Sequence, residues 1–102
     1  MSNITKGRNA LVARILNGDG HAERAQRRAA YANDGLTGPL ATLVDKVARQ
    51  AHRVTDDDIA AARASGLSED QLFELVICAA VGQATRQYES ALATLAAATE
   101  TT

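Results

Sequence analysis

The chain has few aromatic residues, whose large side chains fill a core between widely spaced backbones. It contains no tryptophan, and its aromatic residues are limited to Tyr31, Phe73 and Tyr88. Alanine is abundant instead, accompanied by Leu, Val and Ile. Alanine and leucine favour helices over strands, and small side chains require closely packed backbones. The composition therefore predicts an all-α domain.

A single cysteine, Cys78, excludes an internal disulfide and a cysteine-rich metal site. One thiol without a partner fits a reducing compartment. The start of the chain has no apolar segment of secretory type, because Arg14 interrupts the run LVARIL. No apolar run reaches the roughly 18 residues of a membrane span. We therefore expect a cytoplasmic protein that does not enter a membrane.

Opposite charges are separated along the chain, although the net charge is only −1. Residues 1–53 carry nine Lys and Arg against four acidic residues, whereas residues 54–102 carry two Arg against eight acidic residues. The two halves should attract each other within or between subunits, and an anionic partner for the first half is the alternative.

The second helix is expected to present a basic face. Arg24, Arg27 and Arg28 share one side of it, where arginines can contact phosphates. Glu23, however, offers Arg27 a partner four residues away, and the chain as a whole is slightly acidic. We therefore expect no nucleic-acid binding.

Start and stop signals divide the chain into five expected helices. Asp19 is expected to cap the second helix, Pro39 to begin the third, Thr55 to cap the fourth and Gly66 to end it. One face of the second helix is expected to be small, with Ala22, Ala25, Ala29 and Ala32, opposite the basic face. The third helix is expected to continue to about position 54, because apolar residues keep their helical spacing that far. We treat 1–102 as a single domain, with N-terminal helices in 1–36 and the core in 37–98.

The segment GLSEDQLFELVICAAVGQATR is expected to form the centre of the fold. Ser68 and Gln71 have the spacing of a capping box. Between Leu72 and Gly82 only Glu74 is polar, so this helix is apolar on every side and must be surrounded by protein. Gly82 is expected to be a point of close packing. These features predict a compact bundle of about five helices around a long apolar C-terminal helix, completed by other subunits.

The sequence VARQAHRVTDDDIAAARASGLSEDQLFELVICAAVGQATRQ resembles the core of the carboxymuconolactone decarboxylase and alkylhydroperoxidase D-like superfamily. In that family a helix leads into a short helix that ends in glycine, and an acidic cap and an apolar helix with a glutamate follow. The resemblance covers residues 40–95. It implies an all-helical fold, a homo-oligomer such as a trimer or hexamer, and active sites near the subunit contacts.

Peroxidase members of this family carry the motif Cys-x-x-Cys-x-x-x-His before the glycine turn. Placed without gaps against Gly66, the motif falls on Ala51, Val54 and Asp58. These side chains cannot supply a thiolate nucleophile, a resolving thiol or an imidazole. The resemblance therefore implies the fold without the thiol peroxidase activity. The decarboxylase branch needs no cysteine, but its acid–base residues do not match this chain position by position.

Glu74 and His52 are the candidate catalytic residues. A carboxylate held in an apolar helix is expected to have a raised pKa, which suits a general acid or base. The alternative for Glu74 is structural pairing, for example with Arg49 or Arg53. His52 lies one residue from the position of the first family thiol, and its alternative is a surface or capping histidine.

Arg86 is a candidate ligand-binding residue, because a guanidinium where the last helix turns polar suits an anionic ligand. Its alternative is an ion pair with Glu89 or with another subunit. Cys78 lies in the middle of the apolar run and is expected to be an inert core residue. The two histidines and the acidic residues show no metal-ligand spacing, so we expect no metal and no other cofactor.

The sequence supports two functional hypotheses. The first is a non-redox member of the superfamily, a small helical homo-oligomer that acts as a binding or accessory protein for a small molecule. The alternative is a small acid–base enzyme of decarboxylase or lactone type that uses Glu74 and His52 near a subunit interface.

Overall fold

The part of the chain that the computed structural model describes consists of helices and short connections. It covers the backbone of residues 2–100 and the side chains of residues 6–100. The elements are α1 (Ser2–Asn17), α2 (Arg24–Ala32), α3 (Gly38–Arg49), the 3-10 turn η1 (Ala51–Arg53), α4 (Asp56–Ala64) and α5 (Glu69–Glu100). No strand occurs between residues 2 and 100. The all-α prediction and the expected five α-helices are confirmed.

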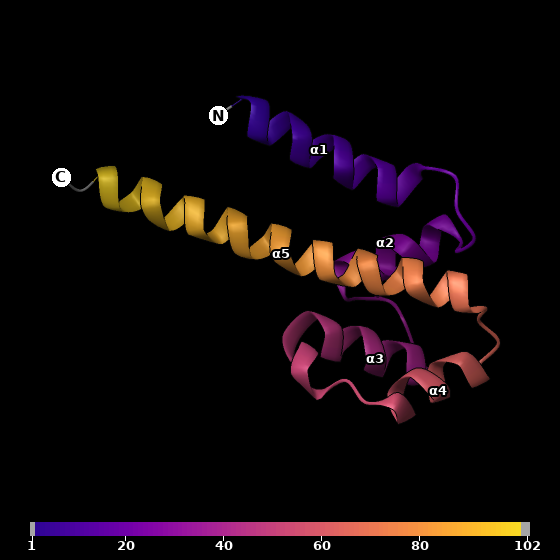
Figure 1. The fold of residues 1–102 in the computed structure, drawn as a ribbon. Helices are drawn as coiled ribbons and strands as arrows, with labels where there is room; N and C mark the ends of the chain where they lie inside the picture. Colours follow the sequence, from indigo (N-terminus) through magenta and orange to yellow (C-terminus); the bar gives the residue numbers. More distant parts are fainter. Residues whose placement is uncertain (1, 101–102) are drawn as a thin grey trace.

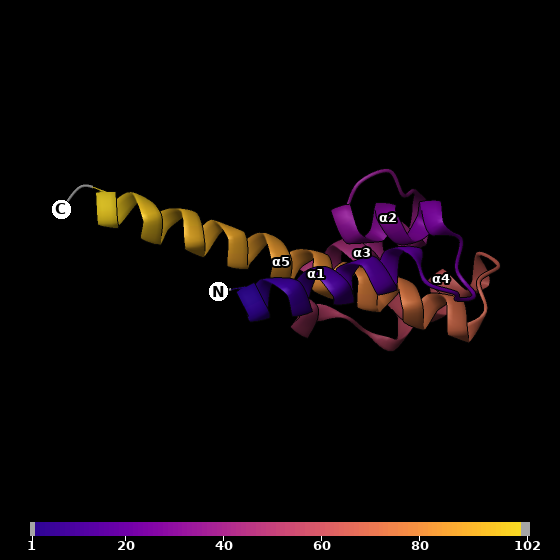
Figure 2. The ribbon, with the colours of Figure 1, turned by 90° about the horizontal axis from the view of Figure 1, so that it is seen from above.

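Helix α5 runs the length of the molecule, and the other helices gather mainly around its first half (Figure 1). α1 lies antiparallel to α5 on one side, and the pair of α3 and α4 lies on the opposite side. Figure 2 shows α2 on a third side of α5. α2 packs against α5 more extensively than any other helix does. The centre of the fold is therefore the predicted segment at the start of α5.

The contact between α2 and α5 is close because a glycine of α5 lies against the last turn of α2. Gly82 faces the backbone of Tyr31, and a Cβ built at Gly82 would overlap the Tyr31 carbonyl oxygen. Ala30 and Ala79 are fully buried nearby in the core. The expectation that Gly82 is a point of close packing is confirmed. A glycine inside a helix costs approximately 1 kcal/mol relative to alanine. Here that cost is offset, because only glycine lets the backbones of α2 and α5 approach so closely.

The hydrophobic core lies between the first half of α5 and the inner faces of α2, α3 and α4. Its largest fully buried side chains are Leu43, Val44, Leu75 and Cys78. The buried residues of α5 are Leu72, Leu75, Cys78, Ala79 and Gly82. On another side of the same helix, Phe73 is 65% exposed. A single protomer therefore does not enclose α5 completely.

The connection from α3 to α4 differs from the sequence prediction. α3 ends at Arg49, and Gln50 leaves the helical region with φ −147° before η1. α4 begins as predicted, because Thr55 Oγ1 accepts a hydrogen bond from the Asp58 N–H at 3.2 Å and Asp58 Oδ2 accepts one from the Thr55 N–H at 2.9 Å. Lys46 Nζ on α3 lies 2.9 Å from Asp58 Oδ2. This ion pair connects α4 to α3.

Helix α2 corrects two predictions. Its N-cap is Glu23 rather than Asp19, and the Glu23 side chain makes no capping hydrogen bond. The buried residues of the helix are Arg27 and Ala30. Of the four alanines predicted to share its small face, Ala22 is buried just before the helix, but Ala25 and Ala32 are exposed. Alanine is small enough to lie on either side of a helix, and here the long aliphatic stem of Arg27 fills the interior.

The second half of α5 extends beyond the core. None of its described residues after Gly82 is buried, and it projects beside the start of α1 (Figures 1 and 2). Arg8 of α1 lies over the ring of Tyr88, with its Cζ 5.1 Å from the ring centroid, which joins the two helices. Within residues 2–100, no helix combines the length and the apolar character needed to cross a membrane.

Candidate functional site

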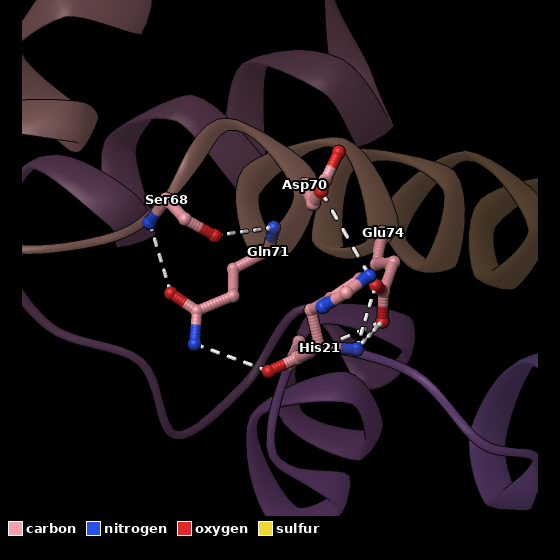
Figure 3. Close-up of polar contacts among 6 residues, drawn as sticks. His21, Ser68, Asp70, Gln71 and Glu74 are labelled. Atoms are coloured by element: carbon pink, nitrogen blue, oxygen red, sulfur yellow. Dashed lines mark hydrogen bonds and ion pairs between the residues drawn. The ribbon is translucent and has the colours of Figure 1, made fainter.

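Glu74 points from the first half of α5 toward the connection between α1 and α2 (Figure 3). Its carboxylate accepts hydrogen bonds from the His21 N–H, at 3.0 Å to Oε1 and 2.8 Å to Oε2, and from the Ala22 N–H at 3.2 Å. Gly20 lies so close that a Cβ built on it would overlap Oε1. The carboxylate therefore satisfies backbone donors just before α2, at the positive end of that helix.

These contacts decide the protonation of Glu74. Burial acts to raise its pKa, but the two backbone N–H donors and the positive charges of His21 and Arg27 outweigh burial, so the pKa is lowered. The expectation of a raised pKa is therefore wrong. The partners are backbone N–H groups rather than Arg49 or Arg53. At neutral pH Glu74 is a carboxylate that is bound by its own protein.

The start of α5 holds His21 through several contacts (Figure 3). Ser68 and Gln71 form the predicted capping box, in which the Gln71 N–H donates to Ser68 Oγ at 3.1 Å and the Ser68 N–H donates to Gln71 Oε1 at 2.9 Å. Gln71 Nε2 also donates to the His21 carbonyl at 3.1 Å. At the surface, His21 Nε2 lies 3.8 Å from Asp70 Oδ2. The α1–α2 connection is thus fixed to α5 through backbone and side chain.

A cavity of about 170 Å³ lies beside the Glu74 carboxylate, between α1, α2 and α5. Its lining consists of Arg14, Ile15, Asp19, Arg27, Glu74, Ile77 and Cys78. Glu74, Ile77 and Cys78 share one face of α5, because they are spaced at i, i+3 and i+4. The two isoleucines supply apolar walls among charges of both signs. A cavity of this volume holds roughly five or six water-sized groups, so it suits a small ligand.

Arg27 is the buried charge of this cavity, with 4% of its surface exposed. Its Nη1 donates to the Ile15 carbonyl at 3.2 Å and to the Gly18 carbonyl at 2.8 Å, at the end of α1. A positive charge there complements the negative end of the α1 dipole. Arg27 Nε has no hydrogen-bond partner among the described residues. The guanidinium is thus anchored through one nitrogen and retains donor capacity elsewhere.

Cys78 lies in the wall of the cavity as a neutral thiol. Burial raises its pKa, Arg27 acts in the opposite direction, and the Glu74 carboxylate adds to the increase. Cys78 Sγ lies 3.8 Å from the Ile15 carbonyl oxygen, which is a weak hydrogen bond from a thiol. The thiol is therefore not activated as a nucleophile, in agreement with the core role expected from its position.

His52 lies outside this site. It is exposed on η1, which packs against α3, and it does not line the cavity beside Glu74. A single protomer therefore does not bring His52 and Glu74 together as an acid–base pair. Their joint action remains a hypothesis that requires a second subunit.

Arg86 lies at the other end of α2. Its Nη1 donates to the Tyr31 carbonyl at 2.6 Å, and its Nη2 donates to Gln83 Oε1 at 3.0 Å. The first bond satisfies a carbonyl in the last turn of α2, which has no partner of its own within the helix. Glu89 is not its partner among the described contacts. Ligand binding by Arg86 remains a hypothesis, and the residue is not part of the cavity at Arg27.

Two positions of the peroxidase motif, Ala51 and Val54, fall on the connection between α3 and α4, and the third, Asp58, lies in the first turn of α4. Ala51 is exposed on η1, and Val54 is half-buried. The hydrogen bond from Lys46, followed by the one from the Thr55 N–H, lowers the pKa of Asp58. Asp58 is therefore an anion that caps α4 and holds α3, which leaves these positions with a structural role.

Arg27 and His21 are site residues that sequence reasoning misses. The helical spacing predicts a basic face shared by Arg24, Arg27 and Arg28, but of these three only Arg27 is buried. No local signal separates the three arginines, because their spacing places all of them on the side of α2 opposite the alanine face. His21 contributes mainly its backbone, whose role depends on a glutamate far along the chain.

The chemistry of this arrangement favours binding over acid–base catalysis. Both oxygens of Glu74 already accept protein hydrogen bonds, and Cys78 is a neutral thiol. No group of three or more His, Cys, Asp or Glu side chains that could hold a metal ion occurs within the described part of the chain. The cationic donors in the lining of the cavity are the guanidinium groups of Arg14 and Arg27, beside the apolar walls of Ile15 and Ile77.

Comparisons with known proteins found no relative of the chain. No protein-family model, no curated protein and no solved structure matches the chain. The contacts, burial and charges of the site itself therefore carry the functional argument.

Proposed function

We propose that the protein is a small homo-oligomeric binding protein with an alkylhydroperoxidase D-like fold and without thiol redox activity. Its ligand is a small molecule held in the cavity between α1, α2 and α5. The observation that carries the proposal is Arg27, a buried guanidinium in the cavity wall whose Nε has no partner among the described residues. A charged side chain beside the apolar walls of Ile15 and Ile77 is typical of a pocket for a small polar ligand.

The order of elements supports the family part of the proposal. α3 leads through η1 into the short α4, which is followed by Gly66 at φ 110° and then by the capped α5 that contains Glu74. This order agrees with the superfamily core that the sequence resembles. The absence of thiols at Ala51 and Val54 supports a non-redox role.

Exposed apolar side chains support self-association. Phe73, Ile59 and Val76 border a groove of about 250 Å³ between α4 and α5, and Arg63 and Glu69 also line it. Two-fold symmetry can place Arg63 of one protomer opposite Glu69 of the other, so the groove is self-complementary in charge. We therefore propose a second copy of the chain as its occupant. A hexamer with both two-fold and three-fold axes contains such a contact, whereas a cyclic trimer does not.

Native mass spectrometry of freshly purified protein tests the proposal, because one spectrum reports the number of subunits and any retained small molecule. We expect a single oligomeric species above the single-chain mass of 10.7 kDa. We also expect additional mass that collisional activation removes. A monomer at micromolar concentration would contradict the oligomer, and failure of the cavity to take up any small molecule in ligand screens would contradict the binding role.

Activity assays on the same material test the enzyme alternative. The binding proposal predicts no turnover of lactones and no reduction of hydroperoxides. Turnover with a bell-shaped pH profile that Glu74→Gln abolishes would replace the binding proposal with the acid–base enzyme. The non-redox assignment rests on the missing motif thiols, so reduction of hydroperoxides would contradict it.

A further inference from the structure

We infer that the second half of α5 (residues 83–100) and α1 beside it form an arm that packs antiparallel against the same arm of a second copy, as a four-helix bundle. This inference rests on the proposed self-association and adds a contact that is separate from the groove between α4 and α5. It is carried by an apolar seam on α5 that is symmetric about the middle of the arm, and by the opposite charges of the two helices.

The arm is not covered within its own protomer. None of the described residues of α5 after Gly82 is buried, and this half of the helix projects away from the core (Figures 1 and 2). Leu95 is 63% exposed, and Leu11 on α1 is 50% exposed. An isolated helical segment of this length is marginal in water, and helices in proteins gain most of their stability by packing an apolar face. A partner that covers these leucines would therefore stabilise the arm.

Three residues form an apolar seam along one side of the arm. Tyr88, Leu92 and Leu95 have the spacing i, i+4 and i+7, which places them on one face of a helix. Tyr88 marks the side of α5 that lies next to α1, because Arg8 of α1 stacks over its ring. In a four-helix bundle, each helix turns such a face toward the centre, between its two neighbours.

The seam is complementary to itself about a two-fold axis. A deeper overlap of two antiparallel arms would drive the end of each α5 into the core of the other copy, and a shallower overlap would leave leucine exposed. With full overlap, Tyr88, five positions from the start of the arm, lies level with Leu95 of the second copy, five positions from its end. Leu92 lies level with Ala91 of the second copy, close to the axis. Each seam residue thus meets an apolar residue, as a two-fold contact requires.

The charges of the arm favour α1 of one copy beside α5 of the other. α1 carries Lys6, Arg8 and Arg14 and no acidic residue, whereas residues 83–100 carry Glu89 and Glu100 against Arg86. The ion pairs found among the described residues include neither glutamate. In the proposed register, Arg14 of the second copy lies level with the end of α5, next to Glu100. An arrangement that placed the two α1 helices side by side would bring like charges together.

Cysteine cross-linking of the full chain tests the register. Tyr88→Cys and Leu95→Cys are co-expressed as chains with different tags, and the purified oligomer is treated with oxidised glutathione. We expect a disulfide between the two different chains, because their positions are level. Neither variant alone should cross-link, since two copies of either position lie about 10 Å apart along the bundle. The wild-type chain, whose Cys78 is buried, gives the background.

Two aspartate substitutions test the seam by native mass spectrometry. Leu95→Asp places a carboxylate in the seam and should reduce the largest oligomer at least tenfold. Ala97→Asp is the matched control, because Ala97 is exposed and lies nine residues from Tyr88, on the opposite side of the helix. It should leave the mass unchanged. Helical circular dichroism should persist in both variants, since neither position is buried in a protomer.

An oligomer without the mixed disulfide, or with a disulfide in either cysteine variant alone, would overturn the inference. An unchanged mass for Leu95→Asp would also overturn it. If Phe73→Asp dissociates the oligomer and Leu95→Asp does not, the proposed self-association survives and only the contact between arms fails. A wild-type chain that keeps the mass of one copy would contradict both, as expected if a different protein covers the arm.

Discussion

Glu74 and Arg27 each use a charge to satisfy the backbone of a neighbouring helix. Glu74 accepts the N–H groups that precede α2, and Arg27 donates to the carbonyls at the end of α1. Each charge lies at the helix end of opposite sign, where the dipole stabilises it. Arg27 also contributes to the lowered pKa of Glu74 without a direct ion pair. These residues are thus both the supports of the junction and the walls of its cavity.

Replacing Glu74 with glutamine should lower the free energy of unfolding by about 1–2 kcal/mol, because hydrogen bonds to a charged acceptor are replaced by weaker ones. Glu89→Gln is the matched control, since Glu89 is exposed on the same helix. Its effect should stay within about 0.5 kcal/mol. Urea denaturation at neutral pH measures both. Equal effects of the two substitutions would show that the contacts with His21 and Ala22 do not stabilise the fold.

The pH dependence of stability provides a second measurement on Glu74. Because its pKa is lower in the folded state than the ordinary value of 4.5, its contribution is fully present above pH 4.5 and is lost as pH falls through the folded pKa. The wild-type chain should therefore lose stability below pH 4.5 more steeply than Glu74→Gln. Asp58 keeps its own lowered pKa in both proteins, so it cancels in the comparison. Parallel stability curves for the two proteins would contradict the lowered pKa.

At the scale of elements, α5 contacts both ends of α2, and two of its residues meet Tyr31 near the second end. Glu74 accepts hydrogen bonds from the connection before α2. Gly82 lies against the backbone of Tyr31, and Arg86 donates to the Tyr31 carbonyl near the end of α2. Helices rise about 1.5 Å per residue, so the twelve residues from Glu74 to Arg86 cover about 18 Å, close to the length of α2 with its preceding turn. The two helices therefore run parallel in a fixed register.

Two glycine-to-alanine substitutions test how close this contact is. Gly82→Ala should lower the free energy of unfolding by about 1–3 kcal/mol, because the added Cβ overlaps the Tyr31 carbonyl and forces the helices apart. Gly7→Ala in α1 is the control, since a Cβ there has no heavy atom within 4 Å. It should raise stability by about 0.5–1 kcal/mol. Urea denaturation distinguishes the two, and stabilisation by Gly82→Ala would contradict the close contact.

The helix starts that depend on local chemistry could be predicted from the sequence. Thr55 with Asp58, and Ser68 with Gln71, form caps within four residues, so their sequence spacing determines their contacts. The end of α3 could not be predicted in this way. Apolar residues continue the helical spacing to Val54, but the chain turns after residue 49 so that α4 meets α3 through a tertiary ion pair.

The candidate site could be predicted only in part, for a related physical reason. Glu74 is recognisable as the one polar residue of an apolar segment. The direction of its pKa shift depends on N–H donors more than fifty positions away, which no local pattern reports. The burial of Arg27 depends on the position of α1, whose carbonyls it binds. Tertiary contacts, rather than propensity, decide both.

At the scale of the whole molecule, packing is uneven along the long axis. The described chain extends 54 × 29 × 20 Å, with the core around the first half of α5 and the rest of that helix projecting beside α1 (Figure 1). Helical segments without packing partners are marginal in water. The predicted attraction between the oppositely charged halves is realised in part within the protomer, by Lys46 with Asp58. The exposed apolar side chains of the groove between α4 and α5 are where the proposed contact between protomers would add stability.

Phe73→Asp tests those contacts directly. Because Phe73 is 65% exposed, the substitution removes little packing within a protomer, so the helical circular dichroism spectrum should persist. If a second copy covers the groove between α4 and α5, a carboxylate there is desolvated without a partner, and the oligomer should dissociate at least tenfold more readily. Light scattering over a dilution series measures the mass. Ala25→Asp adds the same charge to an exposed position of α2 and should leave the mass unchanged. An unchanged mass for Phe73→Asp would place the subunit contact elsewhere on the molecule.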